Sequence, residues 1–445
     1  STGGFATVDG AENPGPAITK VVDDGENVKV QGWFMSEAAQ VTLGGAAAQV
    51  TSCADLGDGK VELTVAKPDS FAGGQAVVRV DENGKHSCQS ANLGESTSAR
   101  YYDQTDLPVP DEMSEWGAWQ LVGYAGDIFC LPRTALSDLD QAHASLLKYD
   151  PDTASWTSVA FPNADMLAQA GLADVVDATA ATFDGDLVML LGDSAGASAF
   201  FSYSRERVLK GEDPWEPLGT AFLLSESAPF ASTLASDGDA LYLFGGLYGS
   251  ASGASAEGSS VLRVGSDWQS LEYAGTLVTA RIRPQVSYGN DTFLVSGGAG
   301  MGGSIQLGGI AGAELVAWTS ESIDIDTGEI LPPELQGSML DFSTFSAQTG
   351  QLSYASGAVE DGFMIAGSVN DADTADTYKL ALADEELSLY FDADGVPLRA
   401  SQMTLLSPAA VAYEGQFYVL AATQDAPYRV FSATATDTVA QPGDY

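Results

Sequence analysis

The chain has 445 residues, and 61 Asp and Glu against 18 Lys and Arg give a formal net charge of −43. A surface this acidic repels phosphate backbones and anionic lipid headgroups, so nucleic-acid binding and membrane-surface binding are excluded. No apolar run approaches the roughly 20 residues of a membrane-spanning helix, and the 49 glycines and 45% hydrophobic residues favour a folded, loop-rich, mostly β protein.

The excess of carboxylates has two interpretations. It is compatible with simple solubility, as in a salt-adapted source, and also with an acidic binding face. The chain starts at Ser1 and not at Met, which suggests a processed chain or a piece of a longer secreted or wall-attached polypeptide. We therefore expect an extracellular or cell-surface location.

Three cysteines are present. Cys53 and Cys88 both fall in the first hundred residues and are predicted to form a disulfide, which fits an oxidising, extracellular setting. Cys130 lies in an apolar strand, residues 127–131, and is expected to be a buried small hydrophobe.

Residues 1–15 lack periodicity and are interpreted as a linker. Residues 16–95 then contain seven short β-rich runs bounded by turns such as Asp24-Gly25 and Asn83-Gly84. Seven short strands in so few residues predict a sandwich of the immunoglobulin type. The runs are residues 17–22, 27–34, 40–43, 47–53, 60–65, 76–80 and 86–91.

The details of this segment point to one subgroup of such sandwiches. Its opening Pro16-Ala17-Ile18, the strand at 28–34 with Gly32-Trp33, the Gly44-Gly45 turn and the run at 73–80 resemble the TIG (IPT) domain family. That resemblance implies a spacer or a binding module. Residues 96–115, with Pro108 and Pro110, are interpreted as a connector to the next domain, although residues 99–102 are also suited to supply it with an outer strand.

From residue 116 onward one unit recurs: a strand of small residues, a turn containing glycine, and an apolar strand. The turn glycine or its equivalent returns about every 50 residues, with one longer interval, and about 50 residues is the period of kelch repeats. The six copies are residues 119–131, 178–192, 230–246, 283–298, 353–367 and 408–422.

The second half of the unit is clearest in the first copy. There a strand ending at Tyr149 is followed by an Asp-Pro turn and by Trp156, and twin glycines at 245–246 and 297–298 complete other copies. These features resemble the kelch signature. The resemblance implies an all-β protein with a six-bladed kelch-like β-propeller over residues 116–445. The outermost strand of the last blade is then either residues 436–439 or a segment from before residue 116.

A four-stranded blade is apolar on both faces, so blades bury these faces by stacking around an axis. The connectors after the second strand of several copies are long, and they are residues 133–143, 247–260, 299–313 and 368–377. In kelch-like propellers this loop position shares a face with the loops between blades, which implies a binding surface there. Residues 164–176 have helical spacing and predict one short helix between blades.

No cofactor is predicted. Only His86 and His143 are present, so a histidine-based zinc or copper cluster cannot be assembled. Acidic turns at residues 324–329, 371–374 and 392–395 suit either calcium or ordinary hairpin chemistry. No catalytic residue is assigned, because paired carboxylates are plentiful by number alone and a serine nucleophile also needs a histidine, of which the large domain has only His143.

The candidate binding residues are Arg281, Arg283, Arg399 and His143. The first two lead into an innermost strand, where the kelch resemblance implies an arginine that can bind carboxylates or sugars near the axis. An internal salt bridge is the alternative in a chain this acidic. Arg399 is a weaker relative of the pair.

The sequence thus predicts a recognition scaffold that binds protein or glycan through propeller loops, as the accessory region of a larger secreted protein. The alternative is a carbohydrate-active enzyme of the hydrolase or epimerase type, with Arg281 or Arg283 at the propeller mouth.

Overall fold

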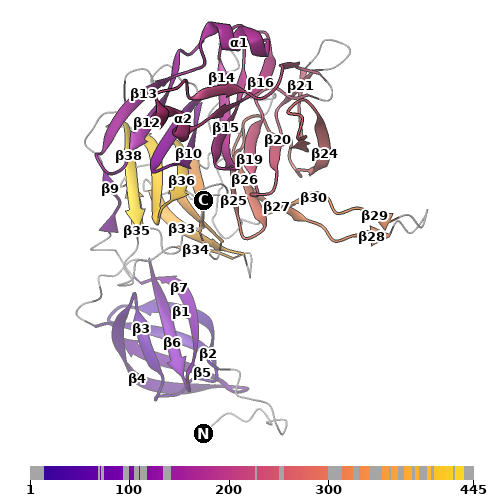
Figure 1. Ribbon diagram of the computed structural model, residues 1–445. Coiled ribbons are helices and arrows are strands. Elements are labelled where there is room, and N and C mark those ends of the chain that lie inside the picture. Colours follow the sequence, from indigo (N-terminus) through magenta and orange to yellow (C-terminus); the bar gives the residue numbers. More distant parts are fainter. Residues whose placement is uncertain are drawn as a thin grey trace. The chain divides into compact units, whose positions relative to one another are not determined.

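The computed structural model divides the chain into two compact units (Figure 1). The first comprises Ser1–Tyr102, Asp376–Lys379 and Ser388–Ala400, and the second comprises Asp103–Ala375, Leu380–Leu387 and Ser401–Tyr445. The residues that the structure describes are 15–68, 71, 75–93, 100–104, 110, 118–133, 142–225, 228–249, 255–298, 313–323, 330–340, 353–359, 362–368, 375–382, 386–389, 398–401, 405–423 and 426–434.

Seven strands of the first unit surround one apolar core, in the order β1-β2-β5-β4-β3-β6-β7. The 12-residue β4 bends, so that its beginning pairs with β3 and its remainder with β5. All seven predicted strands are present. They are β1 (Ala17–Asp24), β2 (Asn27–Trp33), β3 (Gln40–Leu43), β4 (Ala46–Gly57), β5 (Lys60–Ala66), β6 (Gln75–Glu82) and β7 (Lys85–Asn92).

Alternation of side chains builds this core. Val28 and Val30 on β2 are fully buried and lie opposite Val65 and Leu63 on β5, while the intervening residues are only partly buried. A separate short strand, β8 (Arg100–Tyr101), pairs in parallel with β35 (Leu398–Ser401).

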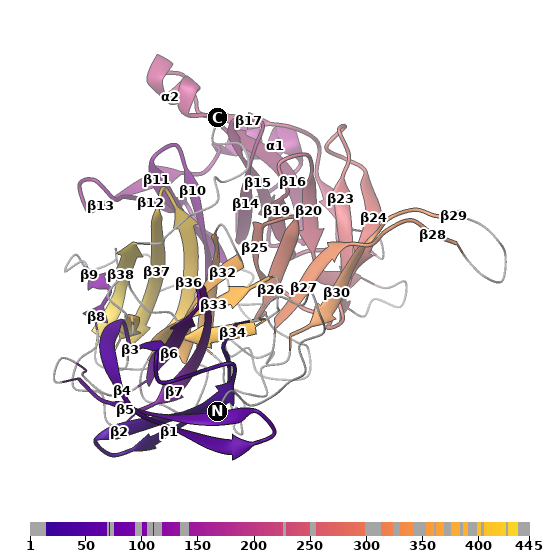
Figure 2. The same ribbon diagram turned by 90° about the horizontal axis from the view of Figure 1, so that it is seen from below.

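Six hairpins dominate the second unit and match the six predicted copies. Their first strands contact one another in a cycle, β10 with β14, β14 with β19, β19 with β25, β25 with β31, β31 with β36, and β36 with β10. We call these hairpins the ring (Figure 2). They are β10/β11 (Ala118–Tyr124, Asp127–Arg133), β14/β15 (Asp177–Phe183, Asp186–Gly192), β19/β20 (Thr233–Ser236, Leu241–Phe244), β25/β26 (Gln285–Gly289, Thr292–Ser296), β31/β32 (Ser353–Val359, Gly362–Ser368) and β36/β37 (Leu406–Tyr413, Gln416–Thr423).

Local turn chemistry explains the hairpins. Asp184 and Gly185 both have positive φ, 52° and 81°, as a two-residue turn between right-twisted strands requires. The second strand, β15, is buried on both faces: Leu187, Met189 and Leu191 enter one hydrophobic core, and Val188 and Leu190 enter another. A sheet placed between two cores in this way needs a neighbour on each side.

Further strands extend the hairpins outward. The last sheet has the order β36-β37-β38-β9, so its outermost strand comes from before residue 116, as one of the two sequence-based alternatives has it. Residues 436–439, the other alternative, lie outside the described residues. The outer strands are β9 (Asp103–Gln104), β12 (Ser145–Asp150), β13 (Ser155–Ala160), β16 (Ala197–Tyr203), β17 (Trp215–Pro217), β18 (Phe222–Leu223), β23 (Ser260–Val264), β24 (Leu271–Thr276), β27 (Ala313–Trp318), β30 (Leu335–Met339), β33 (Ala375–Ala381), β34 (Glu386–Leu389) and β38 (Ala426–Thr434).

Two small hairpins interrupt this pattern. β21 (Leu247–Gly249) and β22 (Ser255–Glu257) occupy one of the long connectors, and β28 (Ser322–Ile323) and β29 (Ile330–Leu331) lie between β27 and β30. The other long connectors lie largely outside the described residues.

The described residues contain two short helices. α1 (Ala164–Ala170) is shorter than the predicted segment because Gly171 adopts a left-handed φ of 89° and its N–H bonds back to the last turn. α2 (Arg205–Lys210) was not predicted. Among the described residues, the helices are too short and too polar to cross a membrane.

Candidate functional site

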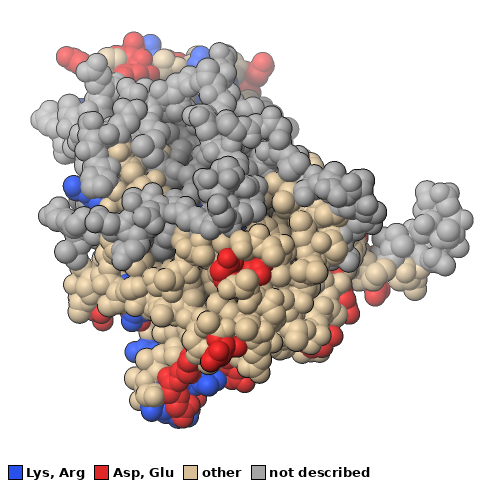
Figure 3. Space-filling model, turned by 90° about the horizontal axis from the view of Figure 1, so that it is seen from above, with Lys and Arg blue, Asp and Glu red and all other residues tan. Residues whose placement is uncertain are grey.

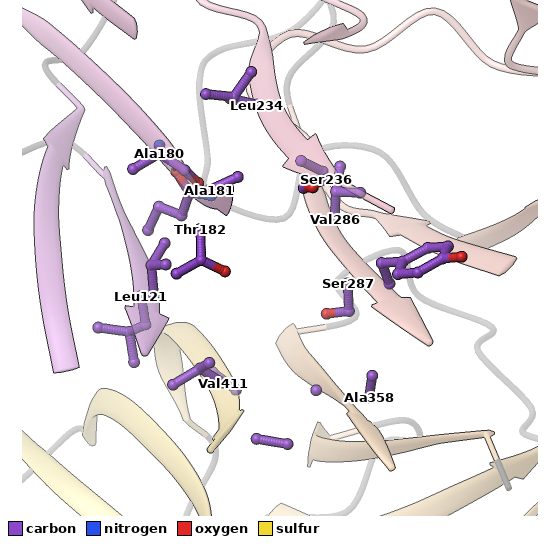
Figure 4. A pocket seen from close by; sticks show the side chains of 17 residues that line it. Leu121, Ala180, Ala181, Thr182, Leu234, Ser236, Val286, Ser287, Ala358 and Val411 are labelled. Carbon is purple, nitrogen blue, oxygen red and sulfur yellow. Dashed lines mark hydrogen bonds between the residues drawn. The ribbon is translucent and has the colours of Figure 1, made fainter. Parts of the chain in front are cut away.

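The first strands of the ring enclose an axial cavity of about 70 Å³. Side chains such as Leu121, Thr182, Ser287 and Val411 surround one small space (Figure 4). Small and apolar residues dominate the lining, and among the 17 lining residues Tyr288 is the one with a side chain that titrates. The full lining is Gln120, Leu121, Val122, Ala180, Ala181, Thr182, Leu234, Ala235, Ser236, Val286, Ser287, Tyr288, Gly357, Ala358, Ala410, Val411 and Ala412.

Polar groups beside this cavity bond to neighbouring strands. Gln120 Oε1 accepts hydrogen bonds from Thr179 Oγ1 at 2.7 Å and from the Ala180 N–H at 3.0 Å. Ser287 Oγ donates to the Ser356 carbonyl at 3.0 Å. Burial, and secondarily the charge of Asp291, raise the pKa of Tyr288 to about 12, so its phenol stays neutral at physiological pH. The described lining therefore offers neither a carboxylate nor an imidazole for acid–base catalysis.

Charged side chains gather instead where β11 ends and where β14, β19 and β25 begin. We call Arg133, Asp177, Thr233 and Arg283 the ionic cluster. Arg133 Nε and Nη2 donate to the two carboxylate oxygens of Asp177 at 3.3 and 3.2 Å, and Arg283 Nε lies 2.9 Å from Asp177 Oδ1. Arg133 Nη1 also donates to Thr233 Oγ1 at 2.8 Å, which donates to the Pro284 carbonyl at 2.6 Å. The cluster thereby ties together residues of four successive hairpins or their leading segments.

The ionic cluster is almost completely removed from solvent. The side chains of Arg133 and Asp177 are 3% and 5% exposed, and that of Arg283 is 8% exposed. Burial, together with the nearby charge of Arg133, lowers the pKa of Arg283 to about 10 against the opposing effect of Asp177. Two guanidiniums thus share one carboxylate in a low-dielectric environment.

His143 lies next to this cluster. Its main-chain N–H donates to the Val175 carbonyl at 2.7 Å, two residues before Asp177, and the residue is half-buried. Burial lowers the pKa of the imidazole, Asp177 raises it, and Arg283 lowers it again. The structure therefore brings together two of the predicted binding residues, His143 and Arg283.

Sequence reasoning missed Arg133 and Asp177. Their positions in the repeat could have indicated them: Arg133 ends the second strand of the first copy, and Asp177 begins the first strand of the second copy. The two residues are register partners in the β11–β14 pairing. A pairing between consecutive copies is a tertiary relation, however, and the repeat pattern alone does not specify it.

Arg281 lies apart from the ionic cluster and is fully buried. Its Nε donates to Glu314 Oε1 at 2.9 Å and its Nη1 to the Gly297 carbonyl at 2.7 Å. Glu314, also fully buried, accepts from the Val278 N–H at 2.6 Å through its other oxygen. In this structure Arg281 is thus part of an internal ion pair, the alternative that the sequence left open.

The remaining candidates are dispersed. Arg399 lies on β35 opposite Tyr101, and its side chain is outside the described residues. Cys53 on β4 and Cys88 on β7 are free cysteines, so the predicted disulfide is not formed in this structure, whereas Cys130 is fully buried as expected. The three acidic turns considered for calcium lie outside the described residues. Within the described part of the chain, no three His, Cys, Asp or Glu residues are grouped to hold a metal ion.

The cycle of inner strands and the sheets buried on both faces define an all-β protein with a propeller-like architecture. No protein-family model matches the chain, and no curated protein matches it. Among solved structures, one titled "Structure of YjhT" is similar at 12% sequence identity and a TM-score of 0.44, covering 74% of this chain and 95% of that chain.

Proposed function

We propose that the chain is a TIG-like, immunoglobulin-type sandwich followed by a six-bladed kelch-like propeller, acting as an extracellular or cell-surface recognition scaffold. It binds protein or glycan through propeller loops and forms the accessory region of a larger secreted protein. The seven strands around one core support the first domain. The six hairpins whose first strands contact in a cycle support the second.

One observation carries the choice of a scaffold over an enzyme: the character of the axial cavity. Its volume of about 70 Å³ is well below the roughly 300 Å³ at which small-molecule sites begin. Its described lining holds small, apolar and hydroxyl side chains, the Gln120 amide and a neutral phenol. We therefore assign the binding of a protein or glycan partner to the propeller surface and not to the axial cavity.

The ionic cluster indicates which surface. It fixes the end of β11 and the starts of β14, β19 and β25, from which connectors between and within hairpins leave. Loops held by a rigid frame are the usual carriers of binding function. His143, half-buried beside Asp177 and Arg283, is the member of this region placed to meet a partner.

The enzyme alternative keeps one supporting observation, which is that a carboxylate, an arginine and a histidine converge here. Asp177, however, is 5% exposed and bonds to Arg133 through both oxygens, so neither oxygen is directed at a substrate. Such a carboxylate suits a structural role better than general-base catalysis.

The test is a glycan and peptide array probed with the full chain, together with glycosidase and epimerase assays. We expect binding without turnover, and weaker binding by His143→Ala. His86→Ala is the matched control, because it removes the chain's other histidine, which lies on β7 of the sandwich. Turnover that Arg283→Ala abolishes while the protein stays folded would establish the enzyme instead.

A further inference from the structure

A second cavity, of about 330 Å³, lies on the flank of the sheet that contains the fourth hairpin, and we call it the flank cavity. It is larger than the axial cavity and reaches the volume of roughly 300 Å³ at which small-molecule sites begin. The seventh of its lining residues, Leu382, directly follows β33. The other six belong to the fourth hairpin or to β27 and β30, and they are Asn290, Thr292, Leu315, Ala317, Gln336 and Ser338.

Strand register explains why these side chains meet. Thr292 on β26 is paired with Ala317 on β27, and Ala317 is paired with Gln336 on β30, so the three form one row across the sheet. Leu315 and Ser338, which are also paired, belong to the next row of the same face. Paired residues, and residues two apart along a strand, project from one face of a sheet. The flank cavity is therefore built on a single sheet face.

The two faces of this sheet differ in character. Phe293, Val316 and Leu335, on the opposite face, are buried in one hydrophobic core. On the cavity face, Gln336 and Ser338 are exposed and carry an amide and a hydroxyl. The sheet of the second hairpin, by contrast, buries apolar side chains of β15 on both faces. A polar departure from the packing rule of the ring points to a function other than packing.

The polar groups of the flank cavity retain hydrogen-bonding capacity. Asn290 Nδ2 donates to the Val359 carbonyl at 3.1 Å, which fixes the amide, and Ser338 Oγ donates to a main-chain carbonyl of β27 at 3.4 Å. Thr292 and Gln336 form no side-chain hydrogen bond with another described residue. Because amides and hydroxyls both donate and accept, the lining offers both kinds of bond to a ligand.

The lining of the flank cavity is uncharged. None of its seven residues is acidic or basic, although the chain has 61 carboxylates and the described surface in Figure 3 shows clusters of Asp and Glu. A cationic ligand would meet no carboxylate there, and an anionic ligand no arginine, lysine or histidine. Leu315, Ala317 and Leu382 add apolar surface. This chemistry selects an uncharged ligand that has both hydroxyls and apolar C–H groups.

We propose that the flank cavity binds a neutral saccharide. The hydroxyls of a sugar ring exchange hydrogen bonds with amides and hydroxyls such as those of Gln336 and Thr292, and its C–H groups pack against the apolar side chains. The proposal rests on the function proposed above, a scaffold that binds protein or glycan. It specifies an uncharged glycan and a place on the flank of the fourth hairpin's sheet, apart from the ionic cluster.

Strand pairing argues against an extended peptide as the occupant. Such a peptide binds by adding its main chain to a free strand edge. β30, the strand that carries Gln336 and Ser338, is paired with β27 along one edge. Along its other edge it pairs in parallel with β24, Leu335 with Gly275 and Gln336 with Thr276. The sheet therefore offers side chains at the flank cavity, and not a free edge.

Titration calorimetry of the full chain with glucose, galactose, mannose and N-acetylglucosamine, and with lactose and maltose, measures this binding. At least one of these sugars should bind, and the corresponding uronic acid and amino sugar should bind more weakly. Gln336→Ala and Thr292→Val should each weaken binding by roughly 2- to 10-fold, because each removes one hydrogen bond to the sugar. Ala317→Leu should abolish binding, because the larger side chain fills the cavity.

Matched controls remove the same groups elsewhere in the ring. Gln269→Ala, at the exposed turn between β23 and β24, and Thr157→Val, on β13, should leave binding unchanged. Every variant is checked for an unchanged melting temperature, and the two polar variants provide an independent test if Ala317→Leu unfolds the chain.

The outcomes separate this inference from the proposed function. Sugar binding that Gln336→Ala, Thr292→Val and Ala317→Leu all leave unchanged would overturn the inference while the scaffold stands. Tighter binding of a uronic acid or an amino sugar, or binding of peptides alone on the array, would also overturn it. A chain that binds neither sugar nor peptide would overturn both.

Discussion

The sandwich and the ring use charge in different ways. In the sandwich, Lys29–Asp24 and Arg79–Asp81 lie at the surface, with side chains 33% to 53% exposed, and the core is apolar. In the ring, Arg281 and Glu314 are 0% exposed, and Arg133 and Asp177 are 3% and 5% exposed.

The difference follows from how each unit closes. Two sheets can cover one core with apolar side chains alone. In the ring, by contrast, the ends of several strands and the segments leading into them meet near the axis and bring backbone polar groups with them. Arginine reaches these groups, as Arg133 does at the Ser232 carbonyl and Arg281 does at the Gly297 carbonyl. The buried charges of the ring therefore hold its structure together. Removing one of them should lower the free energy of unfolding far more than removing an exposed charge of the sandwich.

Among these variants, Asp177→Asn should lower the free energy of unfolding most. It leaves Arg133 and Arg283 buried with no neutralising carboxylate at their centre, and breaking a buried ion pair costs about 3–5 kcal/mol. Urea unfolding of the full chain measures the change. Asp152→Asn, at an exposed turn, is the control, and an equal change in both variants would show that the ionic cluster does not stabilise the ring.

Gly123→Ala should cause the next largest loss in the free energy of unfolding, because Gly123 lies where the first and last hairpins meet. A Cβ at Gly123 would lie 2.2 Å from the ring of Tyr413, whose hydroxyl accepts from the Gly126 N–H at 2.9 Å. Overpacking of this kind lowers the free energy of unfolding by about 1–3 kcal/mol. Thermal unfolding of the full chain measures the loss. The double variant Gly123→Ala/Tyr413→Ala should lose less than the sum of its parts, and strict additivity would mean that the two strands do not meet.

Alkaline pH should destabilise the ring before the sandwich. Burial raises the pKa of Tyr248, Tyr288 and Tyr418 to about 12, whereas residues 17–92 contain no tyrosine. The fold favours the neutral phenol, so this stability is present below the ordinary pKa of 10 and is lost as pH rises toward 12. Arg283, with its pKa lowered to about 10, acts in the opposite sense but is a single group.

Phenolate absorbance and circular dichroism during an alkaline titration test this expectation. A fraction of the tyrosines should titrate late, together with loss of structure. If all tyrosines titrated near pH 10 with the fold intact, the burial of these phenols would not contribute to stability.

The smallest effect is expected from Asp81→Asn in the sandwich. Arg79 donates two hydrogen bonds to Asp81 and lowers the pKa of that carboxyl, but both side chains face solvent. Exposed pairs contribute little because water screens them. The melting temperature should not change measurably, and a loss comparable to that of Asp177→Asn would contradict the contrast between the two units.

Much of the fold could be predicted because its causes are local. Alternating residues such as Val28 and Val30 and turns such as Asp184-Gly185 specify strands and hairpins within a few positions. At the candidate site, Arg283 and His143 could be named in advance for their type and position. Their convergence could not, and although an internal ion pair was one alternative for Arg281, its partner Glu314, 33 residues further along the chain, could not be named either.

The sequence by itself determined the strands, the six hairpins and the acidic character, since these depend on neighbours a few residues apart. Tertiary structure alone decided which charges are buried together, that β9 completes the last sheet, and that β24 joins β30. These outcomes depend on contacts between residues tens to hundreds of positions apart. Such contacts come into being only when the sheets pack side by side and the first hairpin meets the last.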